Sequence, residues 1–200
     1  MPYIIYPDQT GCGRRPLATD NGRSEITLNG RGKRIVGGRV AENNTWPSIC
    51  RLRRNFNGGY GQCGGTLVKN NRGEFYFISA AHCMKDRSIP ASKFVAYCGI
   101  HHLDDIDTDK GLHFEAVTPH WDYNFDDEDD VDNDIAIFKF LIQPTESNFI
   151  RAACIAKDDH QPGEASIAVG WGLDSAGGNR HIVVSVGYFS SHMLCFHLFV

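Results

Sequence analysis

His82 is the residue of this 200-residue chain whose chemistry is best suited to proton transfer, and it lies in Ser79-Ala80-Ala81-His82-Cys83. An imidazole changes charge near neutral pH, so it acts as a general base or acid where a partner fixes its orientation. Asp134 is a candidate of its own, because the run Ile135-Ala136-Ile137 after it places this carboxylate at a strand edge beside a core, but the spacing does not show that it lies near His82. Two other interpretations remain: a structural histidine beside a cysteine, and an aspartate that merely belongs to an acidic run.

Seven cysteines are scattered through the chain, and no Cys-X-X-Cys pair occurs among them. The absence of such pairs argues against zinc ribbons and thioredoxin-like motifs. Scattered cysteines in a chain with 21 glycines instead indicate disulfides and an oxidising compartment. We therefore expect an extracellular, secreted protein, although no signal peptide is visible at the N-terminus. The count is odd, so at least one thiol is left over among Cys12, Cys50, Cys63, Cys83, Cys98, Cys154 and Cys195.

The composition is that of a globular protein, with 42% hydrophobic and 22% charged residues. The net charge of -4 argues against a nucleic-acid-binding protein, and the glycine content favours a β-rich chain.

The chain divides into a leader and a series of predicted strands. Residues 1–34 form a basic, turn-rich leader. Short apolar or alternating runs then predict strands of a sandwich or barrel at 46–52, 64–69, 75–79, 93–99, 135–142 and 165–171.

The last 19 residues, 182–200, contain no Asp, Glu, Lys or Arg. Their length would suit a membrane span, but serines and histidines interrupt the apolar run, so we expect no membrane association.

A second unusual segment lies between residues 122 and 134 and is rich in aspartate. Its simplest interpretation is a solvated, self-repelling loop.

Five short motifs occur in a fixed order along the chain: Arg34-Ile35-Val36-Gly37-Gly38, Cys63-Gly64-Gly65-Thr66-Leu67, Ser79-Ala80-Ala81-His82-Cys83, Asn133-Asp134-Ile135-Ala136-Ile137 and Val169-Gly170-Trp171-Gly172. Together they resemble the trypsin/chymotrypsin-like serine endopeptidase family (peptidase S1), over about residues 34–181 plus Cys12. The resemblance implies an all-β fold of two antiparallel β-barrels, the first essentially complete and the second only partial. It divides the chain into a leader (1–34), the N-terminal part of a peptidase domain (35–181) and a divergent apolar tail (182–200).

The resemblance also assigns roles. His82 matches the histidine that takes the proton of the catalytic serine, and Asp134 matches the carboxylate that holds its tautomer. Lys33-Arg34-Ile35 is similar to a zymogen activation site, where an activating protease cuts after Arg34 and frees the amino group of Ile35. An exposed dibasic loop that is never processed is the alternative. The implied activity is proteolysis of protein or peptide substrates, without a cofactor.

The resemblance further implies disulfide pairs. Cys63 and Cys83 match the bridge that braces the histidine loop, and Cys12 and Cys154 match the bridge that retains a cleaved leader. Cys50 and Cys98 lie outside the common pattern, but the motif alignment places them on strands expected to be neighbours, so we expect a third bridge. Cys195 is then the unpaired thiol.

The chain departs from the family pattern in one important respect. The family's serine lies in Gly-Asp-Ser-Gly-Gly beyond the Val-Gly-Trp-Gly motif, and these 200 residues do not contain that sequence. Asp174-Ser175-Ala176-Gly177-Gly178 lacks the glycines on either side of Asp-Ser that the oxyanion turn uses. We therefore expect a chain truncated before its nucleophile and inactive in peptide cleavage.

Two other functions are weighed against this one. A non-catalytic homologue could bind a protein partner, with Asp126–Asp130 as its contact surface. A metal-binding module would have to use His101, His102, His113 and His120, whose spacing fits no common zinc pattern. Ile100 also stands where calcium-binding members of the family carry a glutamate, so we expect no bound metal.

Overall fold

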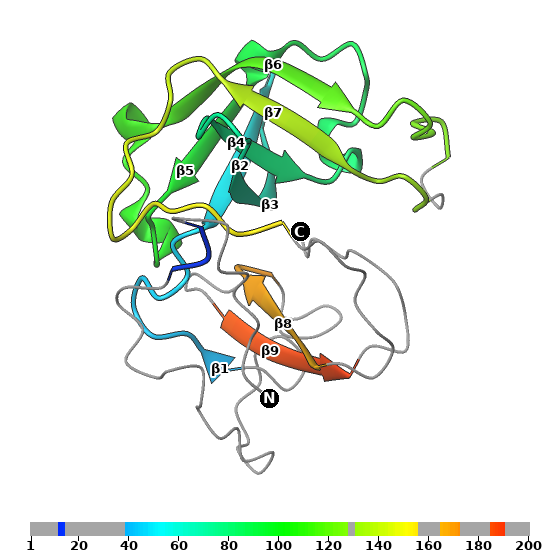
Figure 1. Ribbon diagram of the computed structural model, residues 1–200. Coiled ribbons are helices and arrows are strands. Elements are labelled where there is room, and N and C mark those ends of the chain that lie inside the picture. The colour runs from blue at the N-terminus through cyan, green and yellow to red at the C-terminus, as the bar shows by residue number, and fades with distance from the viewer. Residues whose placement is uncertain (1–11, 15–38, 128–130, 156–164, 173–184, 191–200) are drawn as a thin grey trace.

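A closed barrel of six antiparallel strands forms the larger part of the computed structural model, which describes residues 12–14, 39–127, 131–155, 165–172 and 185–190 (Figure 1). The barrel closes in the order β2-β3-β4-β7-β6-β5. Its strands are β2 (Ile49–Phe56), β3 (Gly59–Lys69), β4 (Phe75–Ser79), β5 (Phe94–Cys98), β6 (Leu112–Pro119) and β7 (Ala136–Phe140).

A second, three-stranded antiparallel sheet lies below the barrel in Figure 1, in the order β1-β9-β8. It consists of β1 (Arg39–Val40), β8 (Ala165–Gly170) and β9 (Ser185–Ser190). The prediction of an all-β fold with a complete first barrel and a partial second one is confirmed. Strand β9 lies within residues 182–200, for which we expected a divergent tail, and the boundary at residue 181 stays a prediction.

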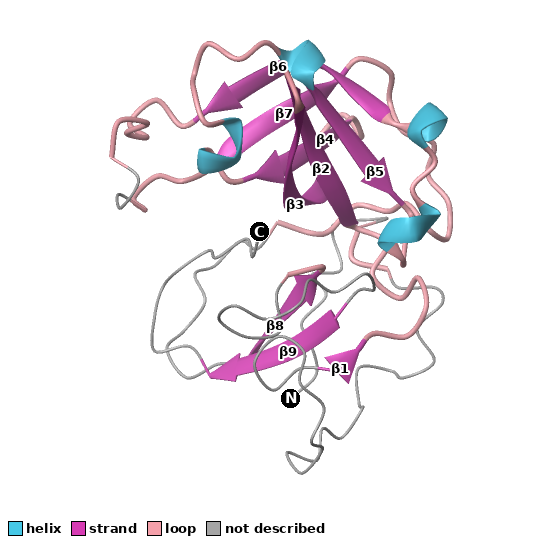
Figure 2. Ribbon diagram, turned by 180° about the vertical axis from the view of Figure 1, so that it is seen from behind, coloured by secondary structure: helices cyan, strands magenta, loops and turns pink. Residues whose placement is uncertain are grey.

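No α-helix occurs among the described residues, and no helix there is long and apolar enough to cross a membrane. The helical turns are of the 3-10 type and lie in the connections that Figure 2 shows around the barrel. They are η1 (His82–Met84), η2 (Ala91–Lys93), η3 (Leu103–Asp105) and η4 (Thr108–Lys110).

Phenylalanines from four strands fill the barrel interior, because alternate residues of each strand point inward. On β4, Phe75 and Phe77 are buried, and on β7 Phe138 and Phe140 are buried. The rings of Phe77 and Phe138 pack edge to face with centroids 5.5 Å apart. Each fully buried ring contributes about 1.5–3 kcal/mol, so this cluster stabilises the barrel.

Three disulfides brace the barrel: two join the pairs that the resemblance implied, and the third joins Cys50 to Cys98, which the alignment of the motifs placed on neighbouring strands. Cys50 and Cys98 are directly opposite on β2 and β5, with Cα atoms 4.3 Å apart. The remaining two bridges have longer Cα separations, 6.2 Å for Cys63–Cys83 and 5.1 Å for Cys12–Cys154. The last one spans 142 residues and fixes the segment around Cys12 to the barrel.

Candidate active site

His82 and Asp134 come together because β4 and β7 are neighbours in the barrel. Ser79 at the end of β4 pairs with Ala136 at the start of β7, so the residues just outside both strands lie at the same barrel end. The chain turns into η1 at His82, directly after Ala80 and Ala81 are buried. Asp134 follows Asn133, whose φ of 59° bends the chain before β7.

The Asp134 carboxylate contacts His82 twice. Oδ1 accepts the backbone N–H of His82 at 2.8 Å, and Oδ2 lies 2.6 Å from Nδ1 of the imidazole. The side chain of Asp134 is 20% exposed, whereas that of His82 is 45% exposed. A carboxylate only accepts hydrogen bonds, so it keeps the proton of the neutral imidazole on Nδ1 and leaves the lone pair of Nε2 available.

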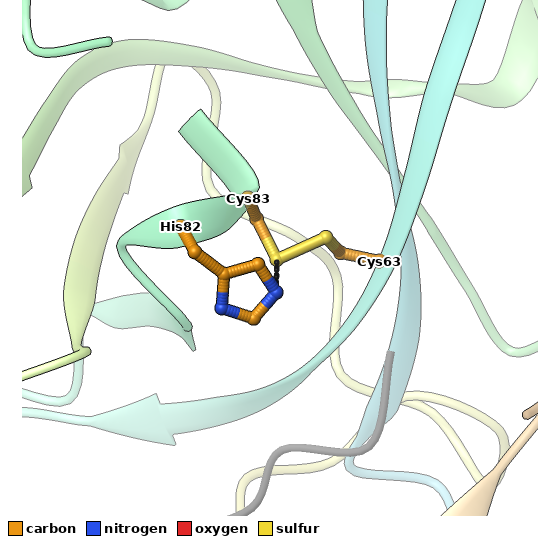
Figure 3. Close-up of side chains that lie close together, drawn as sticks. All are labelled: Cys63, His82 and Cys83. Carbon is orange, nitrogen blue, oxygen red and sulfur yellow. Dashed lines mark hydrogen bonds between the residues drawn. A yellow bond between two sulfur atoms is a disulfide. The ribbon is translucent and has the colours of Figure 1, made fainter. Parts of the chain in front are cut away.

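Nε2 faces the Cys63–Cys83 disulfide, as Figure 3 shows, with the Sγ of Cys83 3.6 Å away. Cys63, His82 and Cys83 therefore bring possible metal-ligand atoms within 4.8 Å of one another. Both sulfurs are bonded to each other, so no thiolate is present to bind zinc. This group does not fit a metal while the disulfide is intact.

A cavity of about 180 Å³ opens beside His82, and among its lining residues there are two strong cations and no carboxylate. Arg54 donates from Nη1 to the carbonyl of Cys83 at 3.2 Å, and burial lowers the pKa of its guanidinium. Lys85 closes η1 with a φ of 67°. The lining is formed by Leu52, Arg54, Gly61, Gln62, Cys63, His82, Cys83 and Lys85.

Sequence reasoning did not identify Arg54 and Lys85 as neighbours of His82. The proximity of Lys85 in sequence was a usable signal, since it stands three residues after His82 in the same turn. Arg54 had no such signal, because it reaches the site only through the packing of β2 against β3 and η1.

Several predicted residues lie outside the site or outside the described part of the chain. The described part of the chain does not include Arg34, Ile35, Ser175 or Cys195.

The predicted histidine group does not form a metal site. His101 is buried, and the centroid of its ring lies 5.0 Å from that of His102. Within the described ranges, the histidines at 101, 102, 113 and 120 form no cluster of three metal ligands. Asp126 and Asp127 are exposed, and residues 128–130 of the acidic run are not described.

Comparisons with known proteins agree with this geometry. The family model described as Trypsin matches residues 35–196. Serine protease SSP1 from Scolopendra subspinipes is 28% identical over 73% of this chain, and Chymotrypsin-like elastase family member 1 from Canis lupus familiaris is 29% identical over 78% of it. Transmembrane protease serine 11C from Mus musculus is 26% identical over 94% of the chain.

The chain covers only 50%, 58% and 38% of these three relatives, respectively. A solved structure titled "Structure of GrC" matches with a TM-score of 0.62 and 23% identity, covering 77% of this chain and 64% of that one. That likeness shows the same fold. The family match spans most of the chain, and the protein belongs to the trypsin-like serine protease family (peptidase S1).

Proposed function

We propose that this chain carries the general-base part of a serine endopeptidase that cleaves protein substrates. The observation that supports the proposal is the 2.6 Å contact between Nδ1 of His82 and Oδ2 of Asp134, in a histidine that also lines a cavity of about 180 Å³. Such an imidazole takes the proton of an attacking serine hydroxyl and returns it to the leaving amine. Asp134 stabilises the imidazolium formed between these two steps.

The reaction also needs a serine and an oxyanion hole, which the family supplies through Gly-Asp-Ser-Gly-Gly. That sequence does not occur in these 200 residues. We therefore propose that the 200-residue polypeptide does not cleave peptides by itself. Proteolysis then belongs to a longer form in which His82 meets a serine from residues beyond those given.

The activation step belongs to the same proposal. Cleavage after Arg34 by a trypsin-like activating protease frees the ammonium of Ile35, and such a charge requires an anionic partner when it is buried. Three disulfides support folding in an oxidising, extracellular compartment. Residues 1–34 are then the leader, and the peptidase domain begins at Ile35.

Peptide hydrolysis is the direct test. We expect no hydrolysis by the 200-residue chain after cleavage at Arg34. A form extended by a transcript-encoded Gly-Asp-Ser-Gly-Gly segment is expected to hydrolyse peptides, and His82→Ala in that form is expected to abolish the activity. Hydrolysis by the 200-residue chain that depends on His82 would contradict the proposal that it lacks a nucleophile.

A second candidate is a non-catalytic homologue that binds a protein partner. The exposed Asp126 and Asp127 favour it, because a carboxylate surface attracts basic partners. Transcript sequencing beyond codon 200 separates the two candidates. A frame that encodes the serine motif supports the protease, and a stop after Val200 supports the binding protein.

A further inference from the structure

Asn43-Asn44-Thr45 is the one Asn-X-Ser/Thr triplet in the 200 residues, and the proposed mechanism does not use it. Such a triplet is the acceptor pattern for N-linked glycans in secreted proteins. The triplet lies in the connection between β1 and β2, at the end of the barrel where the second sheet begins (Figure 1). Its three residues have different environments, and these differences decide when the acceptor can be used.

Asn43 is exposed and lies in a tight turn between Glu42 and Thr45. The backbone N–H of Thr45 donates to the carbonyl of Glu42 at 3.3 Å, which closes this turn. Asn44 adopts a φ of 54°, a left-handed conformation that asparagine tolerates better than most residues. Asn43 is therefore at the surface of the folded protein.

Thr45 is buried, in contrast to the exposed Asn43. Its side chain is only 2% exposed, and its hydroxyl donates to the carbonyl of Glu42 at 3.0 Å. Next to it, Trp46, Ile100 and His101 line a small cavity under the turn. Folding therefore hides the hydroxyl that defines the acceptor, while leaving the amide exposed.

We propose that Asn43 is an N-glycosylation site that accepts its glycan only before residues 42–45 fold. In the transfer, the side-chain nitrogen of Asn43 forms a bond to C1 of the first sugar of a lipid-linked oligosaccharide. The bond between C1 and the diphosphate oxygen breaks, the amide nitrogen loses one proton, and the lipid diphosphate leaves. The transferase has to contact both the amide of Asn43 and the hydroxyl of Thr45, and only the unfolded chain presents both.

Asn43 lines neither the cavity beside His82 nor the cavity beside Thr45. The cavity beside His82 and the cavity beside Thr45 share no lining residue. The test of glycosylation measures glycan on Asn43 and not peptide hydrolysis, so its outcome does not depend on whether the longer form is active.

The test uses the full 200-residue chain with microsomal oligosaccharyltransferase and a lipid-linked oligosaccharide as the probe. One sample is reduced and unfolded, and the other is oxidised and folded. We expect glycan on Asn43 in the unfolded sample, detected by peptide mass spectrometry, and transfer at least ~10-fold slower in the folded sample. No glycan on the unfolded chain, or equal rates in both samples, would overturn the proposal.

Three variants serve as matched controls in the unfolded state, so their folding does not matter. Thr45→Ser keeps the hydroxyl and is expected to accept glycan. Thr45→Val, nearly isosteric with threonine, and Asn43→Gln are expected to accept none. Glycan on either of the last two chains would show that another residue is the acceptor and would overturn the assignment.

Discussion

At the scale of single residues, one carboxylate fixes both the backbone and the ring of His82. Oδ1 of Asp134 holds the backbone N–H and Oδ2 holds the imidazole, so the ring has little freedom to rotate. This arrangement fixes the tautomer that leaves Nε2 unprotonated when the imidazole is neutral. The site is therefore oriented before any substrate arrives.

The substitution Asp134→Asn tests that tautomer in the 200-residue chain. An asparagine NH₂ directed at Nδ1 needs an acceptor there, so we expect the imidazole proton to move to Nε2. Long-range ¹H–¹⁵N NMR of His82 at alkaline pH measures the tautomer. Asp127→Asn, which removes the same charge from the exposed acidic loop, is the control and should leave the proton on Nδ1. An unchanged tautomer in Asp134→Asn would contradict the orienting role.

His101 gives a pH prediction. Burial, assisted by the charge of His102 and opposed by Asp105, lowers the pKa of His101 below its ordinary value of 6.5. The unfolded chain then binds the proton at higher pH than the folded chain does. The contribution of His101 to the free energy of unfolding is thus fully present above pH 6.5 and is lost as the pH falls through the folded pKa.

Urea unfolding between about pH 8 and about pH 5 measures this contribution. We expect His101→Gln to reduce the loss of stability on acidification. His113→Gln, which replaces an exposed histidine, is the control and should follow the unsubstituted chain. Identical acid dependence in His101→Gln and in the unsubstituted chain would show that burial of His101 has no effect on stability.

At the scale of elements, the site depends on the register of β4 against its two neighbours. Pairing of β4 with β7 brings His82 to Asp134, and pairing of β4 with β3 brings Phe77 against the backbone of Gly65. A Cβ atom at Gly65 would lie 2.2 Å from a ring carbon of Phe77 and 2.6 Å from the carbonyl oxygen of Ile78. Glycine is therefore required where the ring packs over β3.

Gly65→Ala is expected to lower the free energy of unfolding by about 1–3 kcal/mol, because the ring and the strand must both shift. Equilibrium urea unfolding provides the measurement. Gly172→Ala is the matched control, since a Cβ atom there meets nothing within 4 Å. Equal stability of the two variants would mean that the barrel absorbs the methyl group without strain.

At the scale of the whole molecule, the Cys12–Cys154 bridge connects the proposed leader to the body of the protein. Its sequence separation of 142 residues encloses the proposed cleavage site after Arg34. Cutting the backbone there leaves two polypeptides that remain covalently joined. The leader would then stay with the peptidase domain after activation.

Gel electrophoresis tests this arrangement. After limited trypsin cleavage at Arg34, we expect one band without reductant and two bands with it. Cys12→Ser should release the leader even without reductant, whereas Arg34→Gln should prevent the cut. Release of the leader from the unsubstituted chain under non-reducing conditions would show that the bridge does not form in solution.

Much of the local chemistry could be predicted from the amino-acid sequence. The motifs around His82 and Asp134 indicated a base and its partner, and apolar alternation located most of the barrel strands. The alternation of apolar residues did not predict β6 (Leu112–Pro119). Phe114 and Pro119 are the only buried residues of this strand, and a register shift between Phe114 and Ala116 interrupts the pattern. Strands with a solvated face and a bulge lose the periodic signal on which such predictions depend.

Contacts between residues that are distant in sequence depend on the folded barrel. Asp134 is 52 residues from His82, and no local pattern fixes a distance across that interval. Barrel closure fixes it, because strand pairing specifies the register of β4 and β7 to one residue. The same closure brings Arg54 beside His82. Residue types therefore define the available chemistry, and long-range pairing of strands determines which of those residues meet.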